Sequence, residues 1–293
     1  MPSGTVGRLL LRGLLAGLIA GLVAFVFAYT VGEGPVSDSI AQEQAHSAPA
    51  GHHDHDHGGG SGPAAGAAQD TADHDTAAHD TAAHEAADAG DEEEELVSRD
   101  LQSTAGLATG VLVYGVAVGG IAALAFCFAL GRVGRFGPRA TAALVAGAAF
   151  VTVYFVPFLK YPANPPAVGN PDTIGKRTAL FFLMIVLSVL IGVAAVIIGK
   201  RLAPRLGTWN ATVAAGAGYA VVMAALALVL PANDDAIPEG FPAALLWDFR
   251  LASIGLQVVL WTGFALLFGA LSQRVLAPAA PAADRAPVTA PAV

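Results

Sequence analysis

Charged residues and cysteine are both scarce in this sequence. Only 13% of the 293 residues are Asp, Glu, Lys or Arg, against 55% hydrophobic residues, whereas a water-soluble domain carries about a quarter charged residues. The single cysteine, Cys127, stands inside an apolar run, so the chain can form neither an internal disulfide nor a CxxC metal site. We expect Cys127 to pack as a small hydrophobic side chain between helices. The absence of a basic patch interleaved with aromatic residues argues against a nucleic-acid partner.

Motifs for catalysis are missing as well. The phosphate-binding pattern GxxxxGK[ST] does not occur; the nearest segment, residues 169–177, has the wrong spacing and ends in Arg177 where Ser or Thr is required. There is no GxSxG pattern and no histidine in a long apolar stretch, so an intramembrane hydrolase would lack its nucleophile and its base. The centres of these stretches also lack the Asp or Glu that proton-coupled pumps commonly use. The sequence therefore predicts a protein that is not an enzyme and binds no organic cofactor.

Six uncharged stretches are long enough to cross a bilayer, which requires about 20 apolar residues. They cover residues 13–32, 107–130, 140–159, 178–199, 211–230 and 251–272. The first is longer than the apolar core of a cleavable signal peptide, about 7–15 residues. The pattern predicts an all-α integral membrane protein, a bundle of about six transmembrane helices surrounded by membrane lipid. We divide the chain into an N-terminus with the first helix (1–32), a disordered outer loop (33–106), a five-helix membrane region (107–272) and a disordered tail (273–293).

The distribution of arginine and lysine predicts the orientation, because cytoplasmic loops are enriched in these residues. If the N-terminus is cytoplasmic, the opposite side carries four basic residues, with Arg250 at a membrane edge: Arg99, Lys160, Lys176 and Arg177. The cytoplasmic side then carries ten: Arg8, Arg12, Arg132, Arg135, Arg139, Lys200, Arg201, Arg205, Arg274 and Arg285. We expect a multi-pass protein of the inner or plasma membrane with both termini in the cytoplasm and the loop outside.

Glycines recur at four-residue spacing in the first two stretches. Gly13, Gly17 and Gly21 share one face of the first helix, and Gly115 and Gly119 repeat the spacing in the second. Glycine lets two helix backbones approach closely in a membrane. We expect a contact within the bundle; a docking face for another subunit is the alternative, and a homo-oligomer stays open.

The predicted outer loop carries the candidate metal ligands. All 8 histidines and 17 of the 23 acidic residues lie between residues 33 and 100, in a segment with almost no large apolar side chains, so we expect it to be disordered when empty. The candidate ligands are His52, His53, Asp54, His55, Asp56, His57, His74, His79 and His84. Imidazole and carboxylate groups bind divalent zinc, cobalt, nickel and copper. The five-residue spacing of the last three histidines does not match the helical period of 3.6, which favours loose capture at several sites; a solvated acidic linker is the alternative.

Polar residues near the ends of the spans are candidates for an ion path. Glu33 directly follows the first span, and Asn164 and Asp172 lie in a proline-rich connector between the third and fourth. Prolines stiffen this connector and so hold its polar side chains in place. A rigid turn without any ligand role is the alternative.

The sixth span adds two more candidates for the path. Asp248 precedes it and is able to pair with Arg250, and Gln257 lies about two turns inside it. An amide is costly in lipid, so we expect Gln257 to face protein or a polar path. An ion pair and an interhelical hydrogen bond are the structural alternatives.

Three segments outside the loop carry a family resemblance. They are RLLLRGLLAGLIAGLVAFVFAYTVGEGPV near the start, FLKYPANPPAVGNPDTIGKRTALFFLM around the connector and GFPAALLWDFRLASIGLQVVLW late in the chain. Together they resemble the CbtA family, predicted cobalt transporter subunits that are usually encoded beside a small single-span partner, CbtB, with histidines of its own. The resemblance implies cobalt uptake in support of cobalamin synthesis. Five spans are often quoted for the family, whereas six are expected here.

These observations predict a membrane subunit for uptake of a divalent transition metal, with Co²⁺ as the expected substrate and Ni²⁺ or Zn²⁺ as other candidates. The loop would gather the ion, which would then pass Glu33, Asp172 and Asp248 and continue past Gln257. The membrane potential or a partner subunit would supply the energy. A metal-responsive membrane scaffold or sensor without transport activity is the alternative; it would need a cytoplasmic output surface, for which the sequence offers no domain.

Overall fold

The computed structural model describes residues 2–47, 102–166, 168–169, 171–232 and 237–277. The nine candidate ligands between His52 and His84 lie outside the described residues. The described elements are α1 (Ser3–Phe27), η1 (Ala28–Gly32), α2 (Glu33–Ser47), η2 (Gln102–Gly106), α4 (Leu107–Ala129), α5 (Pro138–Ala149), η3 (Phe150–Phe155), α6 (Val156–Lys160), η4 (Pro171–Thr173), α7 (Ile174–Leu206), α8 (Thr208–Val229) and α9 (Ala243–Leu276). All of them are helices, and η1, η2 and η3 are π-helices.

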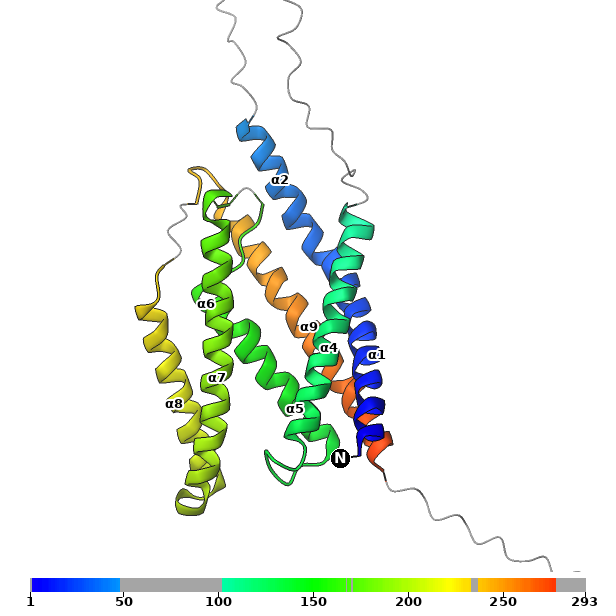
Figure 1. The fold of residues 1–293 in the computed structure, drawn as a ribbon. Coiled ribbons are helices and arrows are strands. Elements are labelled where there is room, and N and C mark those ends of the chain that lie inside the picture. Colours follow the sequence, from blue (N-terminus) through cyan, green and yellow to red (C-terminus); the bar gives the residue numbers. More distant parts are fainter. Residues whose placement is uncertain (1, 48–101, 167, 170, 233–236, 278–293) are drawn as a thin grey trace, which may run out of the picture.

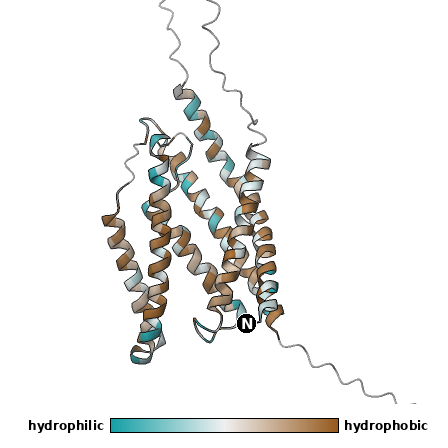
Figure 2. Ribbon diagram, in the orientation of Figure 1, coloured by the Kyte–Doolittle hydropathy of each residue, from teal (hydrophilic) through white to brown (hydrophobic). Residues whose placement is uncertain are grey.

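Six helical segments are long and apolar enough to cross a membrane, which confirms the predicted all-α membrane bundle. They are Ser3–Ala45, Thr104–Ala129, Pro138–Lys160, Ile174–Leu206, Thr208–Val229 and Ala243–Leu276. The spans alternate in direction, so the start of α1 and the end of α9 lie at the same end of the bundle, called here the N-terminal end (Figure 1). The opposite end, called the loop end, carries α2, the connector of residues 161–173 and the start of α9. Hydrophobic residues dominate the middle of the spans, and hydrophilic residues gather toward their ends (Figure 2).

The first helix extends further than the sequence suggested. The chain continues from α1 through η1 into α2 and remains helical to Ser47, so the expected start of the unstructured segment at residue 33 is wrong. The extension packs beside α9, and Ser39 within it is fully buried, with its hydroxyl donating to the carbonyl of Pro35 at 2.7 Å. Contact with α9 stabilises a helix in this polar segment, whose composition alone did not predict one.

The closest helix contact joins α1 to α4 through their glycines. A Cβ added at Gly119 would stand 2.8 Å from the Cα of Gly17, and one added at Gly13 would stand 2.8 Å from the carbonyl oxygen of Gly119. Real Cβ atoms do not approach backbone so closely, so only glycine permits this contact. The prediction of a glycine contact within the bundle is confirmed.

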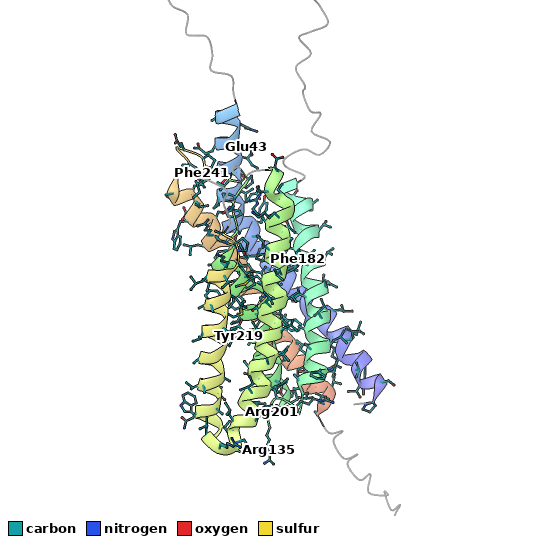
Figure 3. The ribbon with its side chains drawn as sticks, turned by 60° about the vertical axis from the view of Figure 1, so that its left-hand side comes forward. Glu43, Arg135, Phe182, Arg201, Tyr219 and Phe241 are labelled. Carbon is teal, nitrogen blue, oxygen red and sulfur yellow. The ribbon has the colours of Figure 1, made fainter. Side chains whose placement is uncertain are left out.

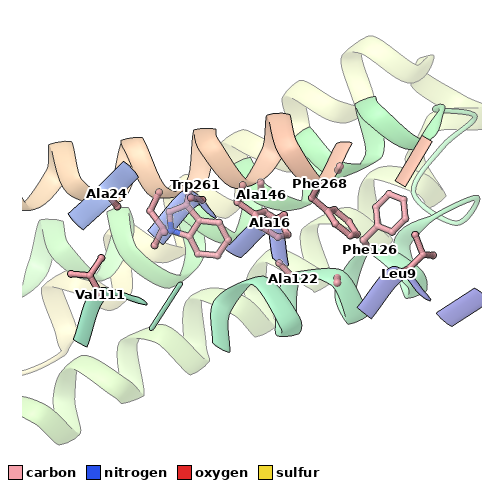
Figure 4. Close-up of a cluster of buried hydrophobic side chains, with 14 residues drawn as sticks. Leu9, Ala16, Ala24, Val111, Ala122, Phe126, Ala146, Trp261 and Phe268 are labelled. Atoms are coloured by element: carbon pink, nitrogen blue, oxygen red, sulfur yellow. The ribbon is translucent and has the colours of Figure 1, made fainter. Parts of the chain in front are cut away.

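A core of α1, α4, α5 and α9 surrounds this contact (Figure 4). Alanines of α1 and α5 allow the helices to approach, and aromatic side chains of α4 and α9 fill the remaining space. Phe126 meets Phe268 edge to face at 5.1 Å between ring centroids, and Phe264 stacks on Phe268 at 5.2 Å. Both geometries are among the favourable ones for aromatic pairs.

The α7–α8 hairpin stands beside this core. Helix α7 packs against η3 and α6, and α8 packs against α7 (Figure 1). Met184, Met223 and Tyr161 form a second, smaller buried cluster there. Ser188 of α7 and Tyr219 of α8 share a hydrogen bond of 2.7 Å, which satisfies two polar groups inside the hairpin.

Two π-helical turns occur where a proline follows in the same helix. A proline ring clashes with the carbonyl four residues earlier and removes one backbone hydrogen bond. For Pro35, that carbonyl belongs to Val31 in η1. For Pro157, it belongs to Val153 in η3. Each turn also contains a threonine whose hydroxyl donates to the carbonyl four residues before it at 2.8 Å, Thr30 in η1 and Thr152 in η3. The wide turns thus have a local cause in the sequence, and π-turns inside helices are frequently found at functional sites.

The glycine contact yields a stability prediction. Gly17→Ala places a methyl group against the backbone of Gly115 and should lower the free energy of unfolding in detergent micelles by about 1–3 kcal/mol, the usual range for overpacking. Gly147→Ala in α5 is the matched control, because its Cβ would meet no atom within 4 Å and alanine favours a helix over glycine by about 1 kcal/mol. Equal stability of the two variants would contradict the importance of the α1–α4 contact.

Candidate ion path

The connector at the loop end is held between α9 and the end of α8. Arg250 of α9 donates from Nη2 to the side-chain oxygen of Asn164 at 3.0 Å and from Nε to the carbonyl of Ala163 at 3.3 Å. On the other side, the hydroxyl of Tyr161 donates to the carbonyl of Pro231 at 2.8 Å. Burial raises the pKa of the Tyr161 phenol, so the hydroxyl keeps its proton at neutral pH and can continue to donate. The connector is therefore a fixed structural element as well as a stiff one.

Arg250 makes this contact with the connector in place of the ion pair with Asp248, which was one structural alternative for this segment. Asp248 is exposed on the first turns of α9, while the Arg250 guanidinium turns to the connector. An arginine presents several donors in a planar fork, which suits a backbone carbonyl and an amide oxygen side by side. The side-chain oxygen of Asn164 therefore accepts a hydrogen bond from Arg250 that holds the connector in place.

The structure does not gather the acidic candidates into one metal-binding group. Glu33 is half-buried at the start of α2 and accepts a bond of 3.4 Å from Ser37, whereas Asp172 is exposed in the connector. Within the described parts of the chain, no three His, Cys, Asp or Glu side chains come together closely enough to hold a metal ion. Glu33, Asp172 and Asp248 thus remain separate polar groups toward the loop end.

A cleft of about 340 Å³ opens beside the connector. It lies between the third span and α7, and four of its ten lining residues are aromatic. Its lining residues are Tyr154, Phe158, Tyr161, Pro162, Ala163, Asn164, Ile174, Arg177, Thr178 and Phe181. The cleft therefore carries a guanidinium and no carboxylate, and it reaches from the connector to Tyr154 within the third span.

Polar side chains gather inside the spans near the base of this cleft. Tyr154 lies in η3, which packs against α9, the helix that carries Gln257. Trp261 lies one turn further along α9, on the same face as Gln257. We call Tyr154, Gln257 and Trp261 the intramembrane polar cluster.

Three atoms of this cluster are buried without a hydrogen-bond partner among the described residues: Tyr154 Oη, Gln257 Oε1 and Trp261 Nε1. An unpaired buried polar atom costs about 1–3 kcal/mol, and such atoms in proteins call for an explanation such as a water or an ion. The amide oxygen of Gln257 is buried within the protein, as the cost of an amide in lipid suggested. The arrangement can present neutral oxygen atoms to a polar species that enters the bundle.

Sequence reasoning identified Gln257 but missed its neighbours. Tyr154 and Trp261 read as ordinary aromatic residues of apolar spans, because their polar atoms are buried together only when η3 packs against α9. The proline at position 157, which accounts for the wide turn that holds Tyr154, was the one local signal in the sequence.

The family comparison covers almost the entire bundle. A family model described as "Probable cobalt transporter subunit (CbtA)" matches residues 6–273. The chain belongs to the CbtA family. No curated protein and no solved structure matches the chain. The matched region includes the six spans, the connector and the polar cluster, so the CbtA chain is a membrane transport subunit, which is not a class of enzyme.

The connector contact predicts coupled mutational effects. Arg250→Gln and Asn164→Ala should each lower the free energy of unfolding of the CbtA protein by about 1–3 kcal/mol, because each breaks a hydrogen bond to a charged group. The double variant should lose less than the sum, since both changes remove the same bond. Unfolding in mixed micelles measures all three, with Arg274→Gln, a change of an exposed arginine at the other end of α9, as the control. Fully additive losses would show that Arg250 and Asn164 act independently.

Proposed function

We propose that this CbtA subunit admits Co²⁺ into the cytoplasm, with Ni²⁺ or Zn²⁺ as possible further substrates. The observation that carries the proposal is the family match to a probable cobalt transporter subunit across all six spans. The intramembrane polar cluster supports it, because polar groups inside a membrane commonly mark the route of a substrate. A uniformly apolar bundle would offer an ion no such route.

The charge distribution supports an orientation with the loop end outside the cell. Nine basic residues of the described chain belong to the N-terminal end: Arg8, Arg12, Arg132, Arg135, Arg139, Lys200, Arg201, Arg205 and Arg274. Figure 3 shows Arg135 and Arg201 at this end, opposite Glu43 on α2. Because basic residues concentrate on the cytoplasmic side, both ends of the chain are cytoplasmic in this proposal, in the inner or plasma membrane.

The segment between α2 and η2 then faces the outside, where it gathers ions. Its histidines and carboxylates, His52 to His84, suit divalent transition metals, and the acidic residues around them raise the local concentration of cations. From there the ion moves past Glu33, Asp172 and Asp248 toward the cleft and then to Gln257. Asn164 serves as an anchor for Arg250 and leaves the ion-binding role to other residues.

A second protein completes the transporter in this proposal. The family description names a subunit, and the resemblance to CbtA points to a small single-span partner with histidines of its own, CbtB-like in character. An inside-negative membrane potential favours cation entry by about 2.3 kcal/mol per charge and 100 mV, so a passive path through the pair is energetically sufficient.

Metal accumulation tests the proposal directly. Cells that express the chain with its partner should accumulate Co²⁺ above cells that express the partner alone, as measured by elemental analysis. A variant with the seven candidate histidines changed to glutamine keeps the loop length; its uptake should fall at low external Co²⁺ and recover at high Co²⁺, because the loop concentrates the ion without forming the path.

A reconstitution control separates the possible outcomes of this experiment. Purified protein in liposomes under an inside-negative potential excludes indirect effects of the host cell. Absence of Co²⁺ entry in both settings would overturn the transport proposal and favour the metal-responsive scaffold.

A further inference from the structure

Basic residues are rare at the loop end, and most of those present flank the cleft. Among the described residues, this end carries Lys160, Lys176, Arg177 and Arg250. The segment of residues 160–178, which includes the connector, has three of these four and a single acidic residue, Asp172. Because basic residues otherwise concentrate at the N-terminal end, this local excess of positive charge needs a reason other than membrane orientation.

The guanidinium of Arg177 is placed at the cleft beside a glycine of the connector. A Cβ added at Gly169 would stand 2.5 Å from Nη1 of Arg177, so only a residue without a side chain leaves room for the guanidinium there. Gly169 also has a φ of +130°, a conformation that glycine adopts more readily than other residues. The backbone of the connector and the side chain from α7 therefore meet at a defined position on the wall of the cleft.

The polar groups of this wall can all donate hydrogen bonds. Arg177 presents only N–H groups, and Thr178 adds a hydroxyl. The side-chain oxygen of Asn164 accepts from Arg250, so its NH₂ group, with two donors, remains for the cleft. No Asp or Glu belongs to the lining residues. The cleft therefore suits an anion with several acceptor oxygens, such as a phosphate, which a guanidinium binds through paired N–H···O bonds.

The remainder of the cleft is apolar and begins at the membrane boundary. On α7 its lining runs from Ile174, the first residue of the helix, to Phe181, which at 1.5 Å per residue is a depth of about 10 Å. Phe158 of the third span lines the opposite side. The next residues along the two helices, Leu159 and Phe182, are exposed, and Figure 3 labels Phe182. Hydrocarbon chains of the bilayer can thus reach the cleft from the side.

We propose that the cleft binds an anionic phospholipid of the leaflet at the loop end, with its phosphate at Arg177 and the first part of one acyl chain between Phe158 and Phe181. A volume of about 340 Å³ lies at the lower end of the range for ligand pockets, about 300–1,000 Å³, so the rest of the lipid stays in the bilayer. A soluble anion would use the guanidinium but gain nothing from the apolar wall.

The site stands independently of Co²⁺ transport. In the proposed transport path, the phosphate adds a negative charge to a cleft whose own side chains supply none. A cation that passes the connector would be attracted by that charge.

Thermal unfolding of the purified full-length chain in detergent measures lipid binding, because a ligand of the folded state raises the unfolding temperature. A titration with dioleoyl phosphatidylglycerol should raise the Tm of the wild type and yield an apparent Kd. Arg177→Gln should raise that Kd about tenfold, the usual size of one hydrogen bond to a charged group. Gly169→Ala keeps every charge but displaces the guanidinium, so it should also weaken binding.

Arg201→Gln is the matched control, because it removes an exposed arginine from the other end of the same helix; its Kd should equal that of the wild type. Each shift is taken from the variant's own Tm without lipid, which separates lost binding from lost stability. Inorganic phosphate and dioleoyl phosphatidylcholine distinguish the possible sources of a phosphate. Neither should raise the Tm at the concentration at which phosphatidylglycerol saturates the wild type.

The outcomes are separate from the test of transport, since no Co²⁺ is present. Equal binding by the wild type and Arg177→Gln would overturn the site. Equal losses in Arg177→Gln and Arg201→Gln would show a general attraction to positive charge and would overturn it as well. An equal shift with inorganic phosphate would assign the cleft to a soluble anion, and an equal shift with phosphatidylcholine would contradict recognition of an anionic headgroup. Each of these results would leave the proposed uptake of Co²⁺ intact.

Discussion

The backbone contact between α1 and α4 is the interaction on which the rest of the bundle depends. Lipid is as apolar as the side chains, so helices in a membrane associate through close packing and polar contacts. Gly13, Gly17 and Gly119 remove the side chains that would hold the two backbones apart. Helices α5 and α9 complete a core on this pair, and α9 in turn carries the buried amide oxygen of Gln257.

The bundle combines a tightly packed core with a less enclosed hairpin. Helices α7 and α8 join the core through η3 and α6, and this junction is where the cleft opens. The connector crosses the junction and is held on both sides, by Arg250 and by the carbonyl of Pro231. The wide turn η3 lies at this junction. Pro157 accounts for its geometry, it packs against α7, and it carries Tyr154 of the polar cluster.

Much of the fold followed from residue types alone. Runs of about 20 apolar residues predicted six spans because bilayer thickness fixes helix length, and four-residue glycine spacing predicted the α1–α4 contact because helical geometry places those residues on one face. The extension of the first helix to Ser47 was not predicted, because a polar helix that gains support from α9 has the composition of a loop. The pairing of Arg250 with Asn164 was missed for a similar reason: the partners are 86 residues apart.

The sequence by itself determined that the chain crosses a membrane, which stretches do so and where its candidate metal ligands concentrate, since these depend on hydrophobicity and residue types read locally. Only the tertiary structure decided that polar atoms of Tyr154, Gln257 and Trp261 are buried without a partner among the described residues, and that Glu33, Asp172 and Asp248 do not come together as a metal-binding group. Which side chains are buried and which come together depends on the rotation and tilt of α4, α5 and α9 about one another. Those angles are set by packing between helices distant in sequence, and no local pattern encodes them.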